Sequence, residues 1–141
     1  MKRELLNKFL NNGITQSILY SPLIDYHQWS LLKFVKDNAK RIKSDEKIID
    51  IGAGELKYKK YFKHCKYKSQ DLCVGDKDWD FSKIDIKSSI YEIPEKDGVF
   101  DYILCTQVLE HLEFPEKAFF EFGRLLKKGG KLILTAHLGF G

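Results

Sequence analysis

The stretch that decides the fold is Ile48-Ile49-Asp50-Ile51-Gly52-Ala53-Gly54. Its first four residues are mostly β-branched and apolar, and a glycine pair follows directly, which favours a buried strand that runs into a sharp bend. Because glycine has no Cβ atom, a ligand can approach the backbone of such a bend closely. In an open parallel sheet, ligands bind beyond the carboxyl ends of the strands. Residues 50–58 are therefore expected to border a pocket.

Helices and strands alternate on both sides of this bend. An amphipathic helix is predicted from about Leu23 to Ile42, and Tyr58, Tyr61 and Phe62 return at helical spacing just after the bend. Further strands are predicted at residues 67–72, 84–86, 99–105 and 131–136, and a further helix at residues 115–128, before Gly129-Gly130.

This alternation indicates an α/β fold: a Rossmann-like, mostly parallel sheet of five strands with helices on both faces. We divide the chain into an N-terminal helical segment, residues 1–44, and one compact Rossmann-like domain, residues 45–141. A chain of 141 residues with 43% apolar side chains is near the usual size of one domain.

Composition excludes several classes of protein. The apolar runs are far shorter than the roughly 18 residues that span a bilayer, and the charged N-terminus lacks a signal-peptide core, so we expect a cytoplasmic protein without membrane contact. The net charge of +4 indicates no partner by itself. Cys65, Cys73 and Cys105 fit neither a disulfide framework nor a paired metal site, so we predict free thiols and no metal.

Two acidic residues flank the glycine bend. Asp71 lies 17 residues after Gly54, at the expected end of the second strand, where a carboxylate can accept hydrogen bonds from both hydroxyls of a ribose. Asp50 lies just before the bend, where it suits an ammonium group better than a phosphate. A dinucleotide motif G-x-G-x-x-G would require glycine at Lys57, which disfavours a pyrophosphate. The helix expected after the bend would offer unpaired N–H groups to a carboxylate or phosphate. A ligand with an amine, a carboxylate and a ribose satisfies all three features.

Three stretches resemble the class I S-adenosylmethionine-dependent methyltransferases, over roughly residues 45–136. Asp50-Ile51-Gly52-Ala53-Gly54 resembles the first motif of the family, and residues 100–111, FDYILCTQVLEH, resemble its fourth strand and the following helix. Residues 124–134, RLLKKGGKLIL, are similar to the turn R-x-L-K-P-G-G into the fifth strand, with Lys128 in place of proline. The resemblance implies S-adenosylmethionine as the cofactor.

The resemblance also implies which residues contact this cofactor. Asp50 would hold the methionine amine directly or through water, and Asp71 would bind the ribose hydroxyls. Ser89 and Ile90 lie where the family contacts adenine, although Ser89 replaces the usual acidic residue. The full set of expected cofactor contacts is Asp50, Gly52, Ala53, Gly54, Asp71, Leu72, Ser89, Ile90, Thr106 and Gln107.

The activity implied is methyl transfer to a hydroxyl of a small molecule or a saccharide, as in bacterial members of the family. His111 is the first candidate for the base that removes the hydroxyl proton, and His137 the second. A module that binds the cofactor without catalysis and a nicotinamide-dependent oxidoreductase remain as alternatives. Lysines alternate with aromatic residues between residues 57 and 68, but the aromatic spacing is helical, so we expect no nucleic-acid partner.

Class I methyltransferases continue past the fifth strand with a helix and an antiparallel pair of strands, whereas this sequence stops at Gly141. We therefore expect a C-terminally truncated fold with an open, apolar strand edge, and self-association of the chain through that edge.

Overall fold

The computed structural model describes residues 26–137. Residue contacts divide the chain into two units, residues 1–37 and 38–141. The helix α3 (Tyr26–Ala39) begins in the first unit, and Leu31, Val35 and Ala39 are buried along it at a spacing of four residues, which confirms the predicted apolar face. The part of the predicted N-terminal segment before Tyr26 lies outside the described residues, and its boundary after residue 44 stays a prediction.

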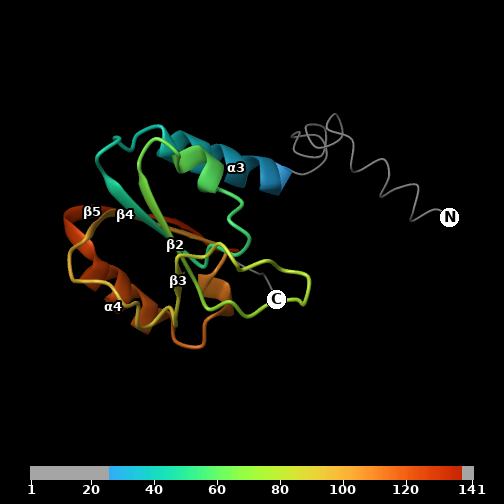
Figure 1. Ribbon diagram of the computed structural model, residues 1–141. Helices are drawn as coiled ribbons and strands as arrows, with labels where there is room; N and C mark the ends of the chain where they lie inside the picture. Colours follow the sequence, from blue (N-terminus) through green and yellow to red (C-terminus); the bar gives the residue numbers. More distant parts are fainter. Residues whose placement is uncertain (1–25, 138–141) are drawn as a thin grey trace. The chain divides into compact units, whose positions relative to one another are not determined.

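The second unit is built on a sheet of five parallel strands, as predicted (Figure 1). Their order is β3-β2-β1-β4-β5. The strands are β1 (Lys47–Ile51), β2 (Lys66–Asp71), β3 (Ile86–Lys87), β4 (Phe100–Thr106) and β5 (Leu126–Thr135). The chain adds strands on one side of β1 and then returns to place β4 on its other side. The order therefore reverses between β1 and β4, the place where open α/β sheets bind ligands.

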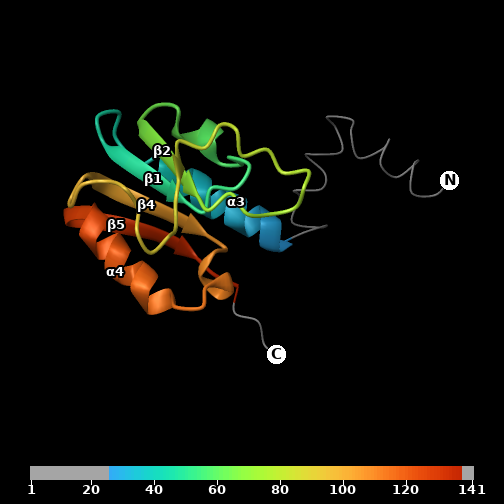
Figure 2. The same cartoon turned by 60° about the horizontal axis from the view of Figure 1, so that its bottom comes forward.

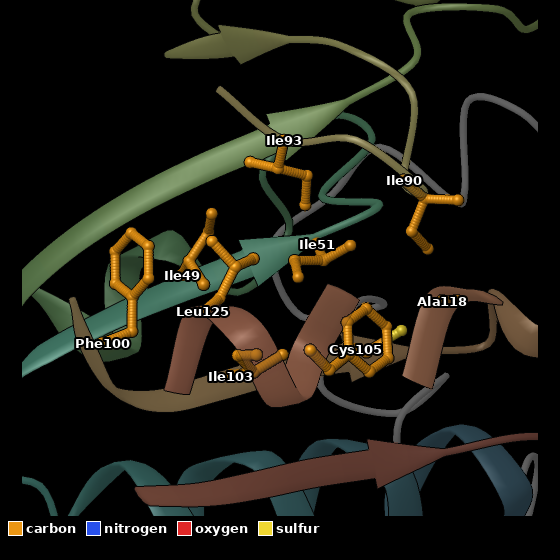
Figure 3. Close-up of a cluster of buried hydrophobic side chains, with 10 residues drawn as sticks. Ile49, Ile51, Ile90, Ile93, Phe100, Ile103, Cys105, Ala118 and Leu125 are labelled. Carbon is orange, nitrogen blue, oxygen red and sulfur yellow. The ribbon is translucent and has the colours of Figure 1, made fainter. Parts of the chain in front are cut away.

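Helices lie on both faces of this sheet. The helix α4 (Pro115–Leu125) runs along one face, where its Ala118 and Leu125 pack with Ile49, Ile51 and Ile103 of the central strands (Figures 2 and 3). On the other face, Phe62 of the short 3-10 helix η1 (Lys59–Phe62) stacks on Tyr67 of β2, with ring centroids 5.8 Å apart. No helix within residues 26–137 is long and apolar enough to cross a membrane.

The predicted end of α4 at Lys128 is wrong. The backbone leaves the helical conformation at Leu126, where it becomes extended (φ −74°, ψ 137°). Leu126 pairs with Phe100 of β4, and its side chain packs against the core. The two basic residues and two glycines that follow therefore belong to β5, in an irregular stretch before regular pairing resumes at Lys131.

Two shorter predictions also need correction. Turns and the four-residue helix η1 follow the glycine bend in place of a regular helix. The strand predicted at residues 84–86 begins only at Ile86, because the side chain of Asp85 accepts hydrogen bonds from the backbone N–H and hydroxyl of Ser69 and so replaces strand pairing there.

Candidate active site at the carboxyl ends of the strands

A pocket of about 630 Å³ opens at the carboxyl ends of β1, β2 and β4. It brings together nine residues that the sequence predicted for a site. These are Gly52, Gly54, Asp71, Leu72, Ser89, Ile90, Thr106, Gln107 and His111. Two predicted contacts, Asp50 and Ala53, do not line it.

The glycine bend forms one side of the pocket. Both glycines have positive φ angles, +70° for Gly52 and +54° for Gly54. Residues with a side chain rarely adopt such angles. A Cβ atom on Gly52 would lie 2.4 Å from a methyl group of Val108, so Gly52 lets the segment after β4 pack onto the bend. A Cβ atom on Gly54 would meet no atom within 4 Å. The backbone at Gly54 is therefore open to a ligand.

Asp71 is held in place at the edge of this bend. Its Oδ2 accepts a hydrogen bond from the backbone N–H of Gly54 at 2.9 Å, and its Oδ1 accepts one from the N–H of Cys73 at 2.7 Å. An ionised carboxylate has about four lone-pair positions, so positions remain for hydroxyl donors of a ligand.

Gln70 of β2 connects the glycine bend to the segment after β3 through hydrogen bonds. Its side-chain oxygen accepts from the N–H of Gly52 at 3.3 Å, and its amide nitrogen donates to the carbonyl oxygen of Ser88 at 2.7 Å. The side chain is buried, and every buried side-chain nitrogen and oxygen atom of the described residues has a hydrogen-bond partner. Sequence reasoning missed Gln70, because nothing in the sequence separates it from the other polar residues of its strand.

Asp50 lies buried below the bend, with 1% of its surface exposed. Burial raises its pKa to about 7; the hydroxyl of Tyr67, which donates to Oδ2 at 2.7 Å, opposes this shift, and the charge of Asp71 adds to it. Since Asp50 does not line the pocket, its contact with an amine, direct or through water, stays a prediction.

Because its pKa is raised in the folded state, the buried carboxyl of Asp50 lowers the free energy of unfolding above neutral pH. The folded state binds the extra proton between the ordinary pKa of 3.8 and about 7, so stability falls as the pH rises through that interval. Asparagine keeps an oxygen that accepts from Tyr67 and carries no charge. We expect Asp50→Asn to raise the free energy of unfolding by about 1–3 kcal/mol at pH 8, and this gain to vanish near about pH 4.

Urea denaturation at pH 8, 6 and 4 measures this effect. The control is Asp80→Asn, because Asp80 is exposed and its pKa is lowered by hydrogen bonds from Ser82. An equal gain at pH 8 in both variants would contradict the assignment of the cost to the buried carboxyl of Asp50.

Backbone strain collects around the pocket. Between residues 26 and 137, three residues other than glycine have φ angles near +60°: Leu56, Cys73 and Gln107. They follow the ends of β1, β2 and β4, respectively. Such strain is typical of ligand sites. Gln107 is held there by β5, because its N–H donates to the carbonyl oxygen of Thr135 at 2.9 Å and its amide nitrogen to the Thr135 hydroxyl at 3.3 Å.

The far side of the pocket follows β4. His111 lies exposed in the 3-10 helix η2 (Leu109–His111), which takes the place of the longer helix that the resemblance implies. His137 does not line the pocket, and its backbone N–H donates to the side-chain carboxylate of Glu110. The sequence did not single out the remaining lining residues, which are Gln70, Val74, Trp79, Tyr91, Val108, Leu112 and Glu113.

The charges around the pocket are mainly negative. Asp71 and Glu113 line it, and Asp50 lies close enough for the charge of Asp71 to act on its pKa. Among the described residues, no lysine or arginine lines the pocket. Such a lining favours a positively charged ligand.

Comparisons with known proteins agree with this geometry. Residues 25–140 match the family described as "Methyltransferase domain". A protein of Methanocaldococcus jannaschii, MJ0638, which is itself uncharacterized, is 46% identical over 50 residues, or 36% of this chain and 22% of that protein.

Solved structures share the fold. An S-adenosylmethionine-dependent methyltransferase from Thermotoga maritima has a TM-score of 0.55 at 23% identity, covering 82% of this chain and 58% of that one. The [4+2]-cyclase SpnF has a TM-score of 0.59 at 17% identity, covering 74% of this chain and 44% of its own. This chain thus spans about half the length of the structures it matches. Since the family match extends over most of the sequence, the chain belongs to the methyltransferase-domain family.

Proposed function

We propose that this chain binds S-adenosylmethionine in the pocket and forms the cofactor-binding part of a methyltransferase that acts on a hydroxyl of a small molecule or saccharide. The observation that carries the proposal is the Asp71 carboxylate, fixed by the N–H groups of Gly54 and Cys73 beside an open glycine bend. A carboxylate held in this way is suited to a ribose diol.

The pocket residues fit the three parts of this cofactor. The ribose would bind Asp71, and the methionyl part would lie over Gly52 and Gly54, near Thr106 and Gln107 at the end of β4. The negative lining suits a ligand that carries both a sulfonium and an ammonium group.

The same features argue against a nicotinamide dinucleotide. A pyrophosphate needs free N–H groups, usually at the start of a helix. Here the N–H of Gly52 donates to Gln70 and the N–H of Gly54 donates to Asp71, while turns follow the bend.

S-adenosylmethionine supplies an activated methyl group, so the protein has mainly to align the acceptor and exclude water. Val108 and Leu112 provide apolar surface on the β4 side of the pocket. His111 would accept the proton from the acceptor hydroxyl, because imidazole exchanges protons near neutral pH.

Calorimetry with S-adenosylhomocysteine and with NAD tests the proposal, followed by transfer from methyl-labelled cofactor to a panel of hydroxyl compounds. We expect S-adenosylhomocysteine to bind and NAD not to bind. Tighter binding of NAD would overturn the assignment of the cofactor.

A second candidate is a module that binds the cofactor without transferring a methyl group. This chain spans about half the length of the solved structures, and SpnF, with the same fold, is a cyclase. The fold alone therefore does not determine the reaction. Binding of S-adenosylhomocysteine without turnover of any acceptor, in a protein that contains this chain, would favour this candidate.

Replacement of His111 tests whether it acts as the base in methyl transfer rather than in binding of the cofactor. We expect His111→Ala to lower kcat by about 100-fold or more while the Kd for S-adenosylhomocysteine stays unchanged. The matched control is His137→Ala, since His137 does not line the pocket. A kcat for His111→Ala within twofold of the unmodified protein would remove His111 as the base.

A further inference from the structure

The wall of the pocket beyond Asp71, toward β3, is apolar. Leu72, Val74 and Trp79 come from the loop between β2 and β3, and Ile90 and Tyr91 follow β3. Leu72 and Val74 leave 62% and 75% of their surface exposed, and Trp79 leaves 46% exposed. Apolar side chains that are exposed at the edge of a pocket gain burial when a flat ligand covers them.

The ring of Trp79 is held in position by its own loop. A Cβ atom on Gly75 would lie 2.7 Å from Cε3 and 3.2 Å from Cδ2 of the indole, so the ring rests directly on the glycine backbone. The Phe81 ring packs nearby, with ring centroids 5.9 Å apart, and the backbone N–H of Trp79 donates to the carbonyl oxygen of Asp76 in a turn. The indole is therefore fixed while part of its surface stays open to the pocket.

The order of the strands determines which part of the cofactor meets this ring. With the ribose at the end of β2 and the methionyl part at the β1 and β4 side, the base must extend toward β3. This step rests on the proposed function. The resemblance placed adenine only near Ser89 and Ile90, which follow β3.

We propose that Trp79 stacks on the adenine ring of the cofactor, and that Gly75 is needed because any side chain there would displace the indole. Stacking on an aromatic ring suits a purine because both surfaces are flat and apolar. Trp79 is thus a binding residue that the loop supplies.

Substitutions in the full chain test this proposal by calorimetry with S-adenosylhomocysteine. Trp79→Ala is expected to raise the Kd about tenfold or more, and Trp79→Phe to keep it within about threefold, because phenylalanine retains an aromatic face. Gly75→Ala is expected to raise the Kd as well. The φ angle of Gly75 is not positive, so alanine suits its backbone and the contact with the indole is the main change.

Tryptophan fluorescence gives a second readout. The chain has two tryptophans, Trp29 and Trp79. We expect S-adenosylhomocysteine to quench the emission of the unmodified chain and of Trp29→Phe, and to leave the emission of Trp79→Phe unchanged. Thermal melts of all variants should coincide within a few degrees, since Trp79 lies on an exposed loop.

The outcomes separate the two proposals. If the unmodified chain does not bind S-adenosylhomocysteine, the proposed function fails, and the role of Trp79 fails with it. If it binds and Trp79→Ala binds equally well, or if the quenching remains in Trp79→Phe, the stacking role alone is overturned.

Discussion

Arg124→Ala is expected to lower the free energy of unfolding by about 2–4 kcal/mol, the largest effect on stability that we expect from one substitution. Its guanidinium donates to the carbonyl oxygens of Ile93 and Glu95 at 2.9 and 2.7 Å, and to carboxylate oxygens of Asp97 and Glu121 at 2.8 and 2.9 Å. Alanine would leave the Glu121 carboxylate, 9% exposed, without its cation. The range allows for water around Arg124, which is 31% exposed.

Urea denaturation measures this loss, with Lys127→Ala as the control. Lys127 also forms an ion pair, with Asp101, but its side chain is 45% exposed, so we expect a loss of at most about 1 kcal/mol. Equal losses in the two variants would contradict the structural role of Arg124.

The effect of Arg124→Ala should also depend on pH. Hydrogen bonds from Arg124 lower the pKa of Glu121 below its ordinary value of 4.5. A lowered folded-state pKa stabilises the protein above the ordinary value, and this contribution is lost as the pH falls through the lowered one. The difference between Arg124→Ala and the unmodified chain should therefore be full at pH 7 and shrink in acid. A difference that stays constant down to about pH 3 would show that the ion pair contributes little.

The role of Arg124 illustrates what spacing can and cannot predict. The sequence around it resembles a family motif at the turn into β5, but the strand begins at Leu126, before the glycines of that motif. The contacts show more: Arg124 fastens the segment from Ile93 to Asp97 onto α4, and this segment follows Ser89 and Ile90 of the pocket wall. The partners lie about thirty residues earlier in the chain, so only the folded structure reveals them.

The sequence pattern predicted correctly those elements whose boundaries depend on neighbouring residues. The buried runs of β1 and β4 and the start of α4 at Pro115 were predicted correctly, since β-branched residues and an N-terminal proline act within a few residues. The end of α4 and the start of β3 were wrong, because distant partners decide them: Phe100 pairs with Leu126, and Ser69 binds Asp85.

The same division applies to the site. Motif spacing brought Gly52, Gly54 and Asp71 into the prediction, and the structure places all three at one pocket. The prediction did not include Tyr67 and Trp79. Tyr67 contributes through a hydrogen bond to Asp50, 17 residues away, and Trp79 comes from the loop between β2 and β3, where no periodic pattern indicates its partners. Such residues gain a role only when the chain brings them to a partner.

Asp71→Ala should have the largest effect on ligand binding, raising the Kd for S-adenosylhomocysteine by more than about 100-fold. Hydrogen bonds to a charged acceptor contribute about 1.5–3 kcal/mol each, and a ribose diol would make two. Alanine also frees the N–H groups of Gly54 and Cys73, so we expect a further loss of about 1–2 kcal/mol in the free energy of unfolding. Calorimetry and urea denaturation measure the two losses separately.

Two further variants distinguish a lost contact from a disturbed loop. Asp80→Ala is the matched control, because Asp80 lies in the loop after Asp71, binds the N–H of Ser82 and does not line the pocket; its Kd should be unchanged. The Kd of Asp71→Asn should lie between those of the unmodified chain and Asp71→Ala. Asparagine has one amide oxygen that can accept hydrogen bonds, so its amino group would face some of the donors that the carboxylate accepts from. If Asp71→Ala binds as tightly as the unmodified chain, the ribose does not lie at the end of β2. The order of sugar and base along the pocket would then be lost, and with it the reason for placing adenine against Trp79.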